Sequence, residues 1–161
     1  MKFSEFKYER PNFDQYKATM TSLIDQFKVA SSASEQLNIV TEINETRNHI
    51  ETMATLASIR HSIDTRDEFY DAEQNYWDEY GPLYEEINSL FYDAVVSSPY
   101  RNELEEKLSK QFFTILDYRL KAFSPEIIAD LQEENKLSSQ YTKLLASAKI
   151  PFDGEERTLP G

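Results

Sequence analysis

The sequence predicts an all-α protein, an antiparallel bundle of about five long helices followed by a short extended or hairpin-like C-terminal segment. The chain has only three glycines and six prolines among 161 residues, a composition that favours long helices over turn-rich β structure. Apolar residues recur at i, i+3 and i+4 intervals through most of the chain, as in amphipathic helices. With 40% hydrophobic residues, a chain of this length can bury a core as one domain.

The charge and composition exclude several classes of partner. A formal net charge of −12 opposes binding to a phosphate backbone, because nucleic-acid-binding proteins carry clustered lysine and arginine. Cysteine is absent, which excludes disulfides and thiolate metal sites and agrees with a reducing compartment. No stretch approaches about 18 consecutive apolar residues, and the first residues lack the apolar run of a signal peptide. We therefore expect a cytoplasmic protein with no nucleic acid and no membrane among its partners.

The first two helices are predicted from their capping residues. Residues 1–11 lack helical spacing and are expected to form an extended arm, since a proline at position 11 disfavours helix before it. Asn12 can cap a first helix that reaches about residue 30. Ser32 and Glu35 form a capping box that predicts a second helix to about residue 63.

The third helix is predicted over residues 66–97. Thr65 and Glu68 form another capping box at its start. Gly81-Pro82 lies inside it and predicts a kink, with a break into two helices as the alternative. Two columns of apolar residues at heptad spacing make a wide face that needs more than one partner helix. The columns are Phe69, Tyr76, Leu83 and Leu90, and Tyr70, Trp77, Tyr84 and Phe91.

The remaining helices each start at a serine followed by a proline. Ser98-Pro99 predicts a fourth helix to about residue 123, and Ser124-Pro125 predicts a fifth to about residue 149. The apolar stripe of the fifth helix is interrupted by Glu134 and Ser138. This interruption is either a solvated stretch or a contact point for another domain.

The C-terminal residues change pattern. Residues 150–159 alternate around Asp153-Gly154, which predicts a small hairpin. We expect residues 1–149 to form an N-terminal helical domain. Residues 150–161 would be the start of a truncated following segment.

No catalytic, cofactor-binding or metal-binding residue is predicted in this chain. His49 and His61 are twelve residues apart, whereas an H-E-x-x-H zinc site needs two histidines four apart on one helix face. Neither histidine has the preceding glutamate of a di-iron bundle. The acidic residues Asp64, Asp67, Glu68 and Asp71 could form a site for a hard cation, but favourable interaction with the dipole of a helix N-terminus is the commoner reason for such a run. Tyr70, Trp77, Tyr84 and Glu134 are retained as possible residues of a substrate channel or an interface, although core packing is the commoner role of such aromatic residues.

Two phrases of the sequence resemble the N-terminal region of bacterial oligoendopeptidase F. They are residues 57–73, ASIRHSIDTRDEFYDAE, and residues 123–149, FSPEIIADLQEENKLSSQYTKLLASAK, and the resemblance extends over the ending IPFDGEE. The resemblance implies an all-helical zinc metallopeptidase of the thimet oligopeptidase-like group that hydrolyses short peptides in a deep channel. In that family the H-E-x-x-H motif and a later glutamate lie downstream of this region, so no zinc ligand carries over to this chain.

The sequence leads to two hypotheses about function. The first is the non-catalytic N-terminal part of such a metallopeptidase, inactive alone, whose helices form part of the channel wall. Its partners would be a downstream catalytic domain that carries zinc, and short peptides. The alternative is a free-standing acidic interaction domain that holds a partner helix on the face of Tyr70, Trp77 and Tyr84.

Overall fold

The protein is an all-α bundle ending in a hairpin, as the sequence predicts. A computed structural model describes residues 5–158 of the chain. Most of these residues lie in α-helices, and the only sheet among them has two strands. The elements are α1 (Phe13–Val29), α2 (Ala33–Ile63), α3 (Glu68–Val96), α4 (Arg101–Leu108), α5 (Lys110–Ala122), the 3-10 turn η2 (Pro125–Ile127), α6 (Ile128–Ser147), β1 (Lys149–Phe152) and β2 (Glu155–Thr158).

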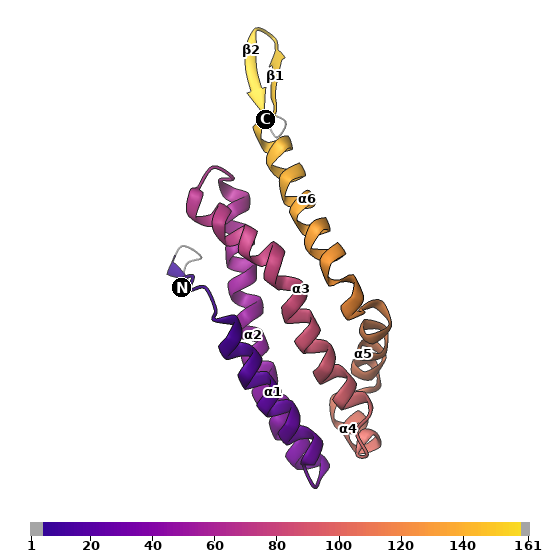
Figure 1. Cartoon of the computed structure of the whole chain (residues 1–161). Coiled ribbons are helices and arrows are strands. Elements are labelled where there is room, and N and C mark those ends of the chain that lie inside the picture. The colour runs from indigo at the N-terminus through magenta and orange to yellow at the C-terminus, as the bar shows by residue number, and fades with distance from the viewer. Residues whose placement is uncertain (1–4, 159–161) are drawn as a thin grey trace.

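A hydrophobic core holds α1, α2 and α3 side by side (Figure 1). Asn12 caps α1 by accepting from the backbone N–H of Gln15 at 2.9 Å, as predicted. Helix α3 packs against α1, α2, α5 and α6, which confirms that its wide apolar face needs several partners. The fully buried side chains include Met20, Phe27, Ile43, Phe91, Tyr92, Leu104 and Phe113. This core holds α2 and α3, the helices that carry the candidate site, in fixed positions.

Helix α3 begins later than predicted but continues through its proline. Its N-cap is Asp67, whose Oδ1 accepts from the N–H groups of Phe69 and Tyr70 at 2.9 and 3.1 Å. The predicted cap at Thr65 was wrong, because a carboxyl directly before the first turn satisfies two of its free donors at once. The alternative of a break at Pro82 is not observed, since α3 is one helix across it.

The predicted fourth helix is two helices in the structure. Ser109, with φ of 90°, ends α4 through its N–H and caps α5 through its hydroxyl, which accepts from Phe112 at 3.3 Å. Helix α4 starts at Arg101 without a side-chain cap. The hydroxyl of Ser98, predicted to cap this helix, accepts from the N–H of Tyr100 at 3.0 Å in the turn before it and donates to the buried Gln36 at 2.6 Å.

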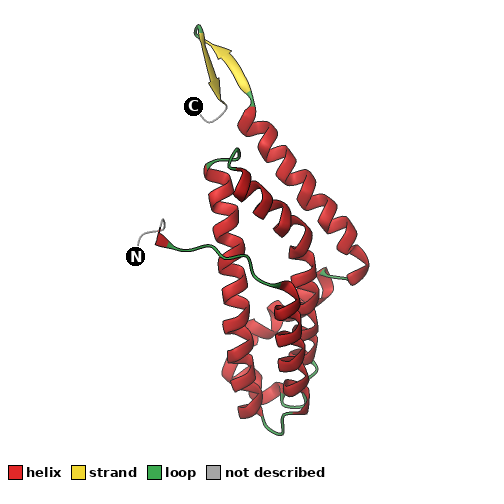
Figure 2. Ribbon diagram, turned by 60° about the vertical axis from the view of Figure 1, so that its left-hand side comes forward, coloured by secondary structure: helices red, strands yellow, loops and turns green. Residues whose placement is uncertain are grey.

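Helix α6 leaves the bundle and projects past it (Figures 1 and 2). Ser124 accepts from the N–H of Glu126, but the first turn is 3-10 and the α-helix begins at Ile128. No residue of α6 is buried. The predicted hairpin is present, with Asp153 and Gly154 at φ of 52° and 81° in its turn. Among residues 5–158 no helix is long and apolar enough to cross a membrane.

Candidate binding groove

The N-terminal arm is fastened across α2 and α3 by a buried carboxyl group. Glu73 of α3 is only 3% exposed. It accepts hydrogen bonds from the hydroxyl of Tyr8 and from Nε and Nη2 of Arg10, the latter two at 2.9 and 2.7 Å. Burial acts to raise the pKa of Glu73, but these hydrogen bonds outweigh it and hold the pKa below its ordinary value. Burial and the bond to Glu73 raise the pKa of Tyr8.

Further contacts fix the course of the arm, which crosses the bundle as a green segment in Figure 2. Arg60 donates to the backbone carbonyl of Phe6 and to the hydroxyl of Tyr70, the second at 2.6 Å. Tyr76 donates to the carbonyl of Pro11 at 3.2 Å. Residues 6–11 of the arm are therefore part of the folded body, and residues 1–4 of the predicted arm lie outside the described residues.

Beside the arm, two neighbouring pockets lie along α2. The first has a volume of about 440 Å³ and the second about 410 Å³. Both are lined by Thr55 and Ile59, so they meet on this helix. We call the two together the α2 groove. Its lining residues are Phe6, Asn48, Glu51, Thr52, Thr55, Leu56 and Ile59 in the first pocket, and Ala54, Thr55, Ser58, Ile59, Gln74, Trp77, Asp78 and Asn135 in the second.

The second pocket lies where α2, α3 and α6 meet, and proline chemistry explains why α6 is there. Pro82 has no N–H, so the backbone carbonyl of Asp78 lacks its helical donor. Asn135 of α6 donates to that carbonyl at 3.3 Å, and Gln132 donates to the neighbouring carbonyl of Glu79 at 2.7 Å. The proline in α3 thus creates an attachment point for a helix that brings no buried side chain.

A charged contact holds α6 nearer its C-terminal end. Lys143 forms an ion pair with Asp71 of α3, which also lies 3.3 Å from Nε2 of the buried His61. The hydrogen bond from Lys143 lowers the pKa of Asp71. Helix α6 is therefore fastened to α3 by polar groups at both the proline and the N-terminal turn of α3.

Asp78 has an unusual environment. Its side chain is 4% exposed, and Oδ1 accepts from Nε2 of Gln74 at 2.8 Å. The other oxygen, Oδ2, is buried and has no hydrogen-bond partner among residues 5–158. Buried polar atoms without partners are rare, so this oxygen marks the groove as a candidate binding site.

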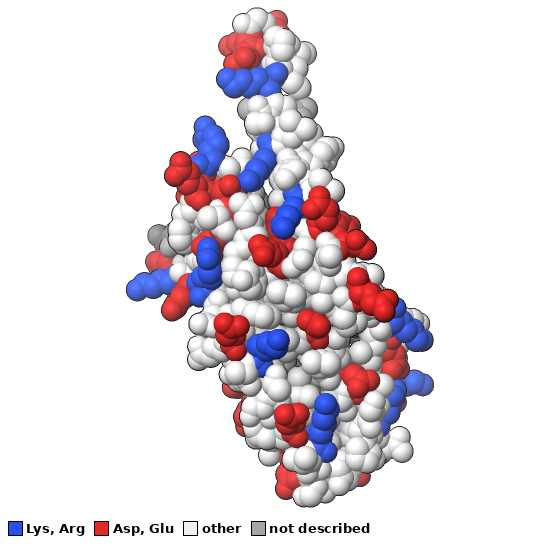
Figure 3. Space-filling view, viewed as in Figure 1, with Lys and Arg blue, Asp and Glu red and all other residues white. Residues whose placement is uncertain are grey.

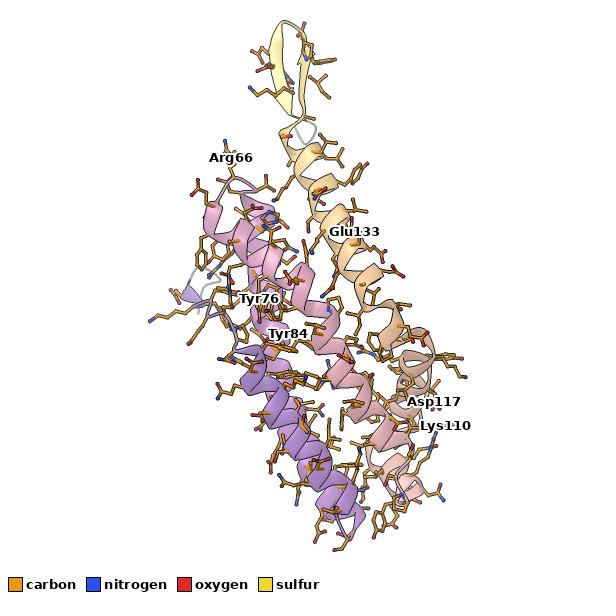
Figure 4. The ribbon with its side chains drawn as sticks, in the orientation of Figure 1. Arg66, Tyr76, Tyr84, Lys110, Asp117 and Glu133 are labelled. Atoms are coloured by element: carbon orange, nitrogen blue, oxygen red, sulfur yellow. The ribbon has the colours of Figure 1, made fainter. Side chains whose placement is uncertain are left out.

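The structure brings together two of the four residues predicted from the sequence, because the ring centroids of Trp77 and Tyr84 lie 5.4 Å apart. Trp77 is 9% exposed, lines the second pocket and donates from Nε1 to Tyr8 at 3.2 Å. Tyr84 is buried and contacts the hydroxyl of Tyr76 at 3.1 Å, on the side of α3 toward the arm and α1 (Figure 4). Tyr70 is partly buried, and Glu134 is exposed on α6 outside the groove lining.

Sequence reasoning missed Asp78 and Asn135. A signal was present for the first of them, because Asp78 lies four residues before Pro82 and its carbonyl must find another donor. No local pattern identifies Asn135 as that donor, since it lies 57 residues further along the chain.

Residues 5–158 offer no ligand set for a metal. Nowhere among them do three or more His, Asp or Glu side chains gather in a way that could hold an ion. His49 is exposed, and His61 pairs with Asp71. In the view of Figure 3, acidic and basic side chains are interspersed over the surface.

The fold and sequence define the class of protein. Residues 3–123 match the peptidase M3 N-terminal domain, so the chain belongs to the peptidase M3 family. No curated protein sequence matches the chain.

Within that family the chain corresponds to the N-terminal region of oligoendopeptidase F-like proteins, as the resemblance implied. It is 52% identical to PZ peptidase A, solved with an inhibitor, with a TM-score of 0.95 over 98% of this chain and 28% of the other. It is 47% identical to a protein described as an oligoendopeptidase F from Bacillus anthracis strain Ames, with a TM-score of 0.95 over 99% of this chain and 29% of that one. The chain thus spans less than a third of the length of these structures.

Proposed function

We propose that this segment forms one wall of the substrate channel of an oligoendopeptidase F-like zinc metallopeptidase that hydrolyses short peptides. Zinc and the catalytic residues would belong to a downstream catalytic domain. Residues 1–149 would be the helical domain of the wall, and residues 150–161 the start of the segment that follows. The whole protein would act on peptides in the cytoplasm.

The observation that carries the proposal is the α2 groove. Its length along α2, from residue 48 to residue 59, is about 17 Å at 1.5 Å per residue. An extended peptide advances about 3.4 Å per residue, so the groove matches about five residues of a short peptide. Polar side chains on helices offer such a peptide hydrogen bonds, while Phe6, Leu56 and Ile59 offer apolar contact.

The alternative of a partner helix on the face of Tyr70, Trp77 and Tyr84 lacks support. Trp77 and Tyr84 are buried, and their rings pack against one another at 5.4 Å between centroids. Tyr84 also packs against Phe13 and Tyr16 of this chain. That face is already occupied by the protein's own α1 and arm.

The test begins with the coding sequence that follows the Gly161 codon. An open frame that continues into H-E-x-x-H supports the proposal, and a stop codon contradicts it. The protein encoded by the continuing frame should cleave a fluorogenic peptide of about eight residues in a chelator-sensitive way. The 161-residue chain alone should not.

A groove variant tests the role of the wall in the longer protein. Ser58 lies exposed in the groove, so Ser58→Leu should raise KM for the peptide at least fivefold with kcat nearly unchanged. Ser22→Leu is the matched control, because Ser22 is exposed on α1 outside the groove lining. Equal kinetics of the two variants would contradict a substrate-binding role for the groove.

A further inference from the structure

The unpaired oxygen of Asp78 is the most unusual polar atom of the α2 groove. A buried carboxyl oxygen without a hydrogen-bond donor is unfavourable, because it has lost water and gained nothing in exchange. Gln74 donates to Oδ1, and Asn135 donates to the backbone carbonyl of the same residue. No side chain among residues 5–158 donates to Oδ2, which is buried beneath its neighbours. Oδ2 is therefore an acceptor that a ligand could use once a neighbouring side chain moves aside.

The pocket around Asp78 favours a positively charged ligand. None of its lining residues is a lysine, arginine or histidine. The hydroxyls of Thr55 and Ser58 come from α2, and the amides of Gln74 and Asn135 come from α3 and α6. Oxygen atoms of all these side chains can accept hydrogen bonds. The ring of Trp77, which is 9% exposed, completes the wall.

We propose that this pocket binds a primary ammonium group, supplied by the N-terminus of a peptide or by a lysine side chain. An ammonium group has three donors and one positive charge. Asp78 Oδ2 would accept one donor, and the hydroxyls and amide oxygens of the pocket would accept the others. Gln74 and Asn135 are partly exposed, and one of these side chains would have to rotate to let a ligand reach Oδ2.

This inference rests on the proposed channel wall and names the chemistry that the wall recognises. It explains why an acidic side chain is buried in a neutral, polar pocket at the junction of three helices.

The chain provides its own reporter for this proposal. Trp77 is the only tryptophan and lines the pocket, so its fluorescence should respond to a bound ligand. The 161-residue chain is titrated with alanyl-alanine amide, which has a free N-terminus, and with N-acetyl-lysine amide, which has only the side-chain ammonium. N-acetyl-alanyl-alanine amide is the uncharged counterpart. We expect a saturable change with at least one ammonium probe and none with the acetylated peptide, and the tighter probe identifies the source of the ammonium group.

Three variants locate the site. Asp78→Asn keeps an acceptor for Gln74 but removes the charge, and it should weaken the better probe at least tenfold. Glu79→Gln is the matched control, because it removes the same charge from an exposed neighbour outside the pocket lining and should change affinity less than twofold. Ser58→Leu keeps Asp78 and narrows the pocket, so it too should weaken binding. Far-UV circular dichroism checks that each variant is folded.

The proposal is overturned if the acetylated peptide binds as tightly as the ammonium probes, if no probe gives a saturable response, or if folded Asp78→Asn binds like the parent chain. Should Asp78→Asn fail to fold, Ser58→Leu decides: unchanged binding overturns the proposal, and weakened binding supports it. Failure here is distinct from failure of the channel wall, because the latter is judged by the kinetics of the Ser58 variant in the longer protein.

Discussion

Helices α1 and α6 are of similar length but are held in the protein by different forces. Helix α1 buries five side chains among 17 residues, whereas α6 buries none among 20. Helix α1 is positioned by hydrophobic packing, which scales with the apolar area removed from water. Helix α6 is positioned by side-chain amides on backbone carbonyls of α3 and by an ion pair with Asp71. The comparison teaches that one chain can contain a rigid core and a helix whose position depends on a few polar contacts.

The largest expected effect lies in the core. Phe91 is fully buried, so Phe91→Ala should lower the free energy of unfolding by about 4 kcal/mol through lost burial and the cavity left behind. Leu144 of α6 is 66% exposed, and Leu144→Ala should change the free energy of unfolding by less than about 0.5 kcal/mol. Urea denaturation followed by circular dichroism measures both. Comparable losses in the two variants would erase the contrast between the helices.

The next effect concerns the arm. Glu73→Gln removes the charge that pairs with Arg10 and should cost about 2 kcal/mol at neutral pH, a value kept low because Arg10 is half exposed. Because the pKa of Glu73 is lowered in the fold, its contribution is present above its unfolded value of about 4.5 and is lost as the pH falls below it. The difference between parent and variant should therefore shrink from pH 7 to pH 3 in urea titrations. A difference that stays constant over this range would contradict the ionic clamp.

A smaller effect is expected at the junction of α4 and α5. Ser109 has φ of 90°, where a side chain is strained and glycine is not. Ser109→Gly should raise the free energy of unfolding by about 1 kcal/mol, because glycine relieves the backbone strain. Its weaker capping lowers stability by only a few tenths of a kcal/mol. Ser109→Ala keeps the strain and removes the cap, so it should lower stability by about 1 kcal/mol. Thermal unfolding compares the two variants, and the same sign for both would refute this explanation.

The smallest effect on global stability tests the attachment of α6. Asn135→Ala should lower the free energy of unfolding by about 0.5 kcal/mol, because one partly buried hydrogen bond is lost. The local consequence is larger: backbone amides of α6 should exchange with deuterium several-fold faster, while those of α1 keep their rates. Hydrogen exchange followed by mass spectrometry makes this comparison. Glu134→Ala is the control, since Glu134 is an exposed neighbour of Asn135, and equal acceleration by both variants would show that the amide contact does not hold the helix.

Local chemistry allowed several of these features to be predicted. Asn12 and Ser32 cap their helices as expected, because each hydroxyl or amide oxygen needs only a backbone N–H three residues away. The turn at Asp153-Gly154 was predicted for the same reason, since the backbone conformation of a tight hairpin favours those residue types. The break at Ser109 was missed because serine carries no strong preference for positive φ.

The candidate site could not be predicted without the tertiary structure. The sequence by itself determined an acidic all-α chain, its family and the position of the proline that leaves the carbonyl of Asp78 without a helical donor. Contacts between distant residues bring Asn135 to that carbonyl and place Trp77 in the lining of a groove. They also bury Oδ2 of Asp78 without a hydrogen-bond partner among residues 5–158. Capping and periodicity act over a few residues and can be read along the chain. A pocket at the junction of three helices depends on contacts between distant residues, which packing alone brings together.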